Sequence, residues 1–218
     1  MIALVRYTAS IMFHSQRYLP SALLFVACMG MFANGAGDQP IVPIFAPMTG
    51  VALVCSAWLA VTLINLEDPV QRSISAVNSG RSPLAAVVVV VLLSSMALAT
   101  LVVALPAVLG NDRTTALDLV TGAVALVAAS CLGTAIGLVT SRLVVRRPGY
   151  SLLATLLLLV VVLLTRGLPP INPLILRLAR AESASGDVLA DTALDAGVAV
   201  VVLVLCAALT QAISARRE

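Results

Sequence analysis

The stretch LAAVVVVVLLSSMALATLVVALPAVL, residues 84–109, decides the fold. It runs for 26 residues without a charged side chain. At a rise of about 1.5 Å per residue, a helix of this length measures about 39 Å, and the hydrocarbon core of a bilayer is about 30 Å thick. Because backbone polar groups in lipid must be satisfied within the segment, the stretch predicts a transmembrane helix.

The composition of the whole chain agrees with this stretch. Of the 218 residues, 61% are hydrophobic and 11% are charged, and the mean hydropathy is +1.09. Soluble domains carry about 25% charged residues. So few polar side chains are not enough to form the water-exposed surface of a globular protein. This composition excludes a soluble enzyme, a nucleic-acid-binding protein and a disordered chain.

Hydropathy in windows of about 19 residues predicts an all-α membrane protein with six transmembrane helices. The expected spans are 18–36, 47–65, 84–109, 116–139, 151–165 and 193–213. We expect one transmembrane domain over 1–218. It comprises an interfacial helix at 1–17, the six spans within 18–213 and a tail at 214–218.

An even number of spans places both termini on one side of the membrane, and the arginines predict which side. Nine arginines lie on the side of the termini: Arg6, Arg17, Arg72, Arg81, Arg142, Arg146, Arg147, Arg216 and Arg217. Four lie in the opposite connections: Arg113, Arg166, Arg177 and Arg180. Since basic residues accumulate in cytoplasmic loops, we expect a multi-pass protein of the cell membrane with both termini and the 214–218 tail in the cytoplasm.

The chain carries no recognisable catalytic or cofactor-binding motif. All thirteen of its basic residues are arginine, and a P-loop needs a lysine on the nucleotide phosphates. Its single histidine, His14, forms no recognisable catalytic dyad with another residue. Its four cysteines do not have the spacing of metal ligands. We therefore expect no enzyme activity, cofactor or metal in this chain, and any ATP must be hydrolysed by another polypeptide.

The first seventeen residues have helical periodicity with two distinct faces. The apolar face consists of Ile2, Val5, Ala9 and Met12. The polar face consists of Arg6, Ser10, His14 and Arg17. This pattern predicts an amphipathic helix lying along the cytoplasmic leaflet, with its arginines near anionic headgroups.

A short helix is also predicted between the second and third spans, on the cytoplasmic side. Asp68 is a natural N-cap followed by Pro69, and Gly80 supplies the stop. The apolar stripe consists of Val70, Ile74 and Val77. Such a stripe packs either on the membrane surface and neighbouring loops or on a cytoplasmic partner, and the pattern leaves both open.

The connection before the last span holds a further apolar segment, residues 167–180, in which Asn172 and Pro173 can start a helix. The fifth span, 151–165, is too short to cross the bilayer unless this segment completes it. We expect a re-entrant or interfacial hairpin on the outer side.

Inside the spans, no aspartate, glutamate, arginine or histidine lies near mid-membrane, which weakens the case for a proton- or ion-coupled carrier. Asp118 and Asp195 come closest, and we expect both in first helical turns, where the helix dipole favours them. Ala129, Gly133 and Gly137 form a small-residue face that predicts close helix packing within the chain.

In organisation, nearly the whole chain resembles the permease subunits of type 2 ABC transporters, most of which are exporters. These subunits have an amphipathic helix before six spans, a coupling helix between spans two and three, and an outer re-entrant hairpin before span six. The stretch from Glu67-Asp68 to Ser79-Gly80-Arg81-Ser82-Pro83-Leu84 is similar to the acidic start, short helix and turn of that coupling segment.

The resemblance implies partners. A separate ATPase, in two copies, would bind ATP and magnesium, and a second copy of the permease or a related permease would complete the pore in the lipid membrane. The implied ATPase contact consists of Glu67, Asp68, Val70, Arg72, Ile74, Val77 and Arg81. The absence of charge in the spans favours a lipidic or amphipathic substrate.

Two other functions remain open on the sequence. A substrate-binding membrane subunit of an energy-coupling importer has about six spans and no ATPase of its own, but it needs no docking helix. A self-contained secondary carrier or channel predicts mid-membrane charges or broken helices in paired positions. An intramembrane enzyme is disfavoured because no base accompanies a nucleophile.

Overall fold

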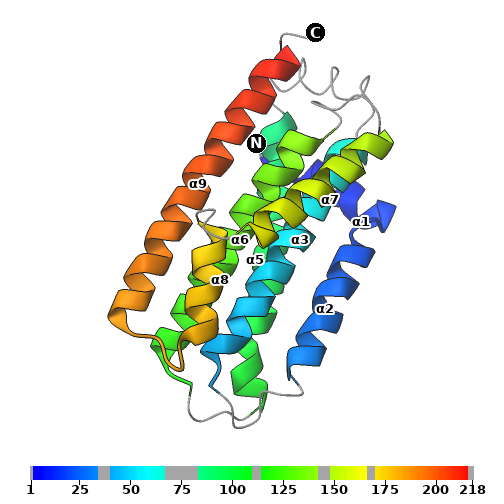
Figure 1. Ribbon diagram of the computed structural model, residues 1–218. Coiled ribbons are helices and arrows are strands. Elements are labelled where there is room, and N and C mark those ends of the chain that lie inside the picture. Colours follow the sequence, from blue (N-terminus) through cyan, green and yellow to red (C-terminus); the bar gives the residue numbers. More distant parts are fainter. Residues whose placement is uncertain are drawn as a thin grey trace.

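The computed structural model describes residues 2–33, 40–66, 83–109, 114–141, 148–165 and 170–215. These residues form eight α-helices and no strand (Figure 1). The helices are α1 (Ile2–Ser15), α2 (Leu19–Ala33), α3 (Val42–Leu66), α5 (Pro83–Leu109), α6 (Ala116–Thr140), α7 (Pro148–Leu164), α8 (Ile171–Arg180) and α9 (Gly186–Ala215). The all-α class predicted from the sequence is confirmed.

Four helices are long and apolar enough to cross a membrane by themselves: α3, α5, α6 and α9. Helices α2 and α7 are apolar but shorter, at 15 and 17 residues. This set of helices suggests a membrane-embedded protein. α1 and the last turns of α9 lie toward the same end of the bundle (Figure 1).

Helices α3 and α6 form the centre of the bundle, and the small residues of α6 allow them to approach closely. Gly133 lies against Leu53 and Ser56 of α3. A Cβ placed on Gly137 would stand 2.5 Å from the Cβ of Ala60 and 2.7 Å from the carbonyl oxygen of Ala57. Ordinary side chains do not fit in this contact, so the small-residue face packs within the chain, as predicted.

The N-terminal helix α1 packs on α5. Met12 is buried, and the Ser94 hydroxyl of α5 lies 3.7 Å from its sulfur. Arg6, Ser10 and His14 are exposed, as predicted for the polar face. Ile2, which the sequence placed on the apolar face, is 80% exposed, because the contact with α5 begins further along the helix.

Two helices begin earlier than the hydropathy predicted. α3 starts at Val42 and contains Pro47, because Val42 and Phe45 are buried and extend its packed face. α9 starts at Gly186 rather than at residue 193. The Ser185 hydroxyl accepts a hydrogen bond from the Val188 amide at 3.3 Å and so caps the first turn.

Helices α7 and α8 follow each other along the bundle. α7 ends about midway between the two ends, α8 continues toward the end opposite to the termini, and α9 brings the chain back (Figure 1). The re-entrant or interfacial hairpin expected on the outer side stays a prediction. Helix α8 continues the course of α7 toward the end opposite to the termini.

Candidate functional site at the break between α7 and α8

The residues that the resemblance assigns to an ATPase contact lie outside the described part of the chain. This holds for Glu67, Asp68, Val70, Arg72, Ile74, Val77 and Arg81. The candidate site that the described residues do form is the break between α7 and α8, together with the helices around it.

Asn172 joins the two sides of the break. It is the second residue of α8, and its Nδ2 donates to the carbonyl oxygens of Leu163 at 3.2 Å and Thr165 at 2.9 Å. The last carbonyls of a helix have no partner within that helix, and lipid offers none. Asn172 thus caps the end of α7 and makes a helix break tolerable inside the bundle.

The other end of α7 is attached to α6 by hydroxyl groups. Ser151 Oγ donates to the carbonyl oxygen of Thr140 at 2.5 Å, and the hydroxyls of Thr140 and Thr155 are 2.7 Å apart. All three side chains are buried. α7 is therefore held by hydrogen bonds at both ends, while between them it presents leucines such as Leu153 and Leu157, which are more than half exposed.

Helix α8 has one buried face and one polar face. Ile171, Leu174 and Leu178 are fully buried, and the helix packs mainly on α3. On the polar face, Arg177 Nη1 lies 3.0 Å from Asp195 Oδ2, and Arg177 Nε lies 3.6 Å from Asp191 Oδ2. These ion pairs fasten α8 to α9.

This pairing changes the role predicted for Asp195. We expected Asp195 in a first helical turn, stabilised by the helix dipole, but it is the tenth residue of α9. The dipole acts only within the first turn, so its stabilisation comes instead from Arg177. The sequence contained the signal, because Arg177 and Asp195 bear opposite charges, but the spacing of eighteen residues hid it.

Asp118, in contrast, occupies the first turn of α6 as predicted. Its carboxylate accepts hydrogen bonds from the Thr115 amide and hydroxyl, each at 2.8 Å, in a capping box. Its other oxygen accepts from the Ala184 amide at 2.7 Å, and the side chain is buried. Asp118 therefore ties the start of α6 to the connection between α8 and α9.

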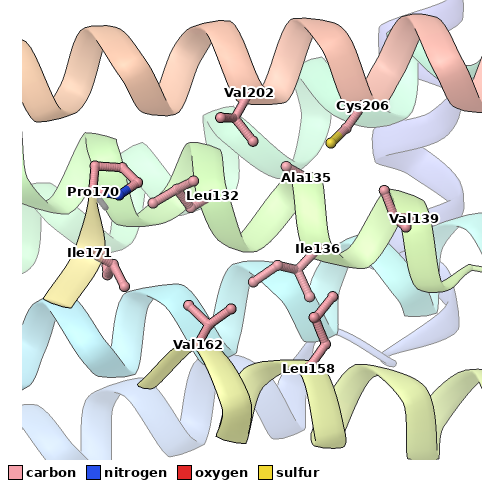
Figure 2. A pocket seen from close by; sticks show the side chains of 10 residues that line it. All are labelled: Leu132, Ala135, Ile136, Val139, Leu158, Val162, Pro170, Ile171, Val202 and Cys206. Carbon is pink, nitrogen blue, oxygen red and sulfur yellow. The ribbon is translucent and has the colours of Figure 1, made fainter. Parts of the chain in front are cut away.

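An apolar cavity of about 210 Å³ lies beside the break. Figure 2 shows side chains from four helical segments around it. α6 contributes Leu132, Ala135, Ile136 and Val139; α7 contributes Leu158 and Val162; the start of α8 contributes Pro170 and Ile171; α9 contributes Val202 and Cys206. None of these residues is charged, so the cavity suits hydrocarbon better than an ion.

Sequence reasoning missed this cavity because its residues are ordinary apolar ones in apolar spans. Among the described residues no group of three or more histidine, cysteine or acidic side chains is placed to hold a metal. No family model matches the sequence, and no curated protein or solved structure matches the chain.

Proposed function

We propose that this chain is the permease subunit of a type 2 ABC transporter. It forms half of a translocation pathway and exports a lipidic or amphipathic substrate, using ATP hydrolysed by a separate subunit. Its six passes are α2, α3, α5, α6, the pair α7 and α8, and α9. α1 lies at the cytoplasmic surface as the interfacial helix, and both termini are cytoplasmic.

The observation that carries the proposal is the direction of the helices. The end of α3, the start of α5, α1 and the last turns of α9 all lie toward one end of the bundle (Figure 1). Segment 67–82 links α3 to α5, so its two attachment points face the compartment that holds the termini. This is the side on which a cytoplasmic ATPase would bind the coupling helix.

The proposed ATPase contact is the one implied by the resemblance, centred on Val70, Ile74 and Val77 with a polar rim that includes Glu67, Asp68, Arg72 and Arg81. Closure of two ATPase subunits would push on this segment and move the spans. The apolar cavity beside α7, and the absence of charge in it, support a substrate with a hydrocarbon part.

One observation favours a second candidate, a self-contained secondary carrier. The break between α7 and α8 is a discontinuous pass, and carriers of this kind use such passes near mid-membrane. They carry them in pairs, however, and α3 and α5 remain continuous through Pro47 and Pro106 in the part of the chain described here.

A pull-down from detergent-solubilised native membranes, followed by mass spectrometry, distinguishes the permease subunit from the self-contained carrier. The permease proposal expects a P-loop ATPase at one copy per chain. The variant Ile74→Asp should lose this partner, while Ser75→Asp, off the predicted apolar stripe, should keep it. An intact chain that elutes without an ATPase supports the carrier, and an unchanged complex with Ile74→Asp contradicts the proposed contact.

A further inference from the structure

Besides the cavity, the structure has a second hollow, and both lie along the junction of α8 with α9. The second is shallow and open, and is lined by Pro173, Leu176, Arg177, Arg180 and Ala181. Arg177 lines this second hollow and pairs with Asp195 of α9, and Val202, which lines the cavity, follows Asp195 by seven residues. Residues at this spacing share a helix face, so an apolar cavity leads onto a basic surface.

The distance from Arg180 to Ile171, at the near edge of the cavity, matches one leaflet of a bilayer. From Ile171 to Arg180 the helix rises about 14 Å, and half of a hydrocarbon core measures about 15 Å. Because α8 runs from mid-bundle toward the end opposite to the termini (Figure 1), Arg180 lies at headgroup level when Ile171 lies near the bilayer centre, and the cavity extends from Ile171 toward Val139 near the other end of the bundle.

The cavity is large enough for part of one acyl chain. In a soluble protein, an apolar cavity of about 150 Å³ stays dry and accepts benzene, and this one measures about 210 Å³. Figure 2 shows Val202, Ile136 and Val162 turned toward the same space from three helices. Hydrocarbon that enters it replaces a void with van der Waals contacts.

The charges near the basic surface select the headgroup. Arg177 is engaged by Asp191 and Asp195, whereas Arg180 is exposed and has no ion pair within the described residues. From residue 177 to residue 195 the chain holds two arginines against four carboxylates, and Glu182 and Asp187 are exposed. The guanidinium of Arg180 attracts the phosphate of a lipid headgroup. The surplus of carboxylates around it repels any further negative charge on the headgroup and attracts an ammonium group.

From these observations we infer that the face formed by α7, α8 and α9 binds one phosphatidylethanolamine molecule from the leaflet at the end opposite to the termini. Its acyl chain occupies the cavity, its phosphate contacts Arg180, and its ammonium group faces Glu182 and Asp187. The inference requires a membrane-embedded chain but no ATPase, so it stands whether or not the permease proposal does.

Native mass spectrometry of the purified full chain tests the inference. The chain is delipidated and then titrated with phosphatidylethanolamine or phosphatidylglycerol of identical acyl chains. We expect one phosphatidylethanolamine per chain, bound about tenfold more tightly than phosphatidylglycerol, in line with one charged hydrogen bond gained or lost. Equal or tighter binding of phosphatidylglycerol overturns the inference, as does a lipid-free dimer that covers this face.

Two neighbouring residues of α9 provide a matched pair for the acyl-chain site. Val202 lines the cavity, whereas Val201 is 57% exposed and does not. Val202→Phe should fill the cavity and weaken lipid binding at least tenfold, and Val201→Phe should leave it unchanged. Equal effects of the two variants overturn the cavity assignment, once circular dichroism has shown that both remain helical.

The headgroup site has its own variants. Arg180→Gln should weaken binding of both lipids about tenfold, while Arg6→Gln, exposed on α1, should weaken neither. The double variant Glu182→Gln with Asp187→Asn should bind phosphatidylethanolamine and phosphatidylglycerol with similar affinity. If Arg180→Gln binds like the unaltered chain, or the double variant keeps the full preference, the headgroup assignment is wrong.

Discussion

Arg177 of α8 and Asp195 of α9 are joined by an ion pair of 3.0 Å between Nη1 and Oδ2, and their side chains are 30% and 17% exposed. The pair ties α8 to the last helix. Asp191 contributes a longer contact of 3.6 Å to the same arginine and is 55% exposed. Coupling between two charges falls with distance and with exposure to water, so the two carboxylates should differ in how much they stabilise α8.

A double-mutant cycle checks this difference. For Arg177→Gln combined with Asp195→Asn, we expect a coupling energy of about 1–2 kcal/mol in the free energy of unfolding. For Arg177→Gln combined with Asp191→Asn, we expect less than about 0.5 kcal/mol, because the pair is longer and more exposed. Unfolding by denaturant in detergent micelles measures both, and equal couplings would contradict the assignment.

The contact between α3 and α6 predicts that glycines in this chain differ sharply in tolerance. Gly137→Ala introduces a Cβ 2.5 Å from the Cβ of Ala60 and should destabilise by about 1–3 kcal/mol, as overpacked cores do. Gly197→Ala, on α9 with nothing within 4 Å, should stabilise by about 0.5–1 kcal/mol through helix propensity. Thermal unfolding of the two variants in one detergent gives the comparison, and shifts of the same sign would count against this packing.

Asn172 is predicted to hold the break between α7 and α8 through its amide hydrogens. Asn172→Asp keeps the size of the side chain but replaces the donor with a carboxylate that faces the carbonyls of Leu163 and Thr165. We expect the free energy of unfolding to fall by about 1–3 kcal/mol, and we expect faster proteolysis between the two helices. Asn172→Gln, which keeps the amide, should lose less. If both variants behave alike, donation by the amide does not hold the break.

Cysteine labelling checks the packing of two helices. Cys55 is buried, and its thiol donates to the Ser21 carbonyl oxygen at 3.3 Å, whereas Cys206 is half-buried beside the cavity. In single-cysteine variants in detergent, N-ethylmaleimide should label Cys206 well before Cys55. Cys55 should react only as the protein unfolds, and a fast reaction in the folded state would show that α2 and α3 are not packed as described.

Only the α6 side of the close contact between α3 and α6 could be predicted from the sequence. Ala129, Gly133 and Gly137 recur every four residues, so the sequence indicated a face without side-chain bulk. The face that meets it, Ser56, Ala57 and Ala60, lies in a helix that is apolar all round, and nothing local marks it as the partner. Periodicity gives a face, but its neighbour follows from the arrangement of all the helices.

The course of the chain after α7 was less predictable, for two physical reasons. Asn172 and Pro173 indicated the start of a helix, but the direction of α8 depends on the burial of Leu174 and Leu178 against α3, more than one hundred residues away. The first turns of α9 were missed because hydropathy counts Asp187 and Asp191 as unfavourable and takes no account of Arg177, which offsets the charge of Asp191. The cavity could not be predicted from the sequence, because it forms only where four helical segments meet.

Helices α3 and α6 meet with no space for a methyl group between them at Gly137, so neither can rotate or slide without forcing atoms into overlap. We therefore expect the two helices to keep this contact when the bundle changes shape. Any change of shape should fall to the periphery, where α9 is the least buried of the four long helices and α7 is held by hydroxyl groups at one end and by a single asparagine at the other. The asparagine end is the weaker of the two attachments, and the bundle should open there first.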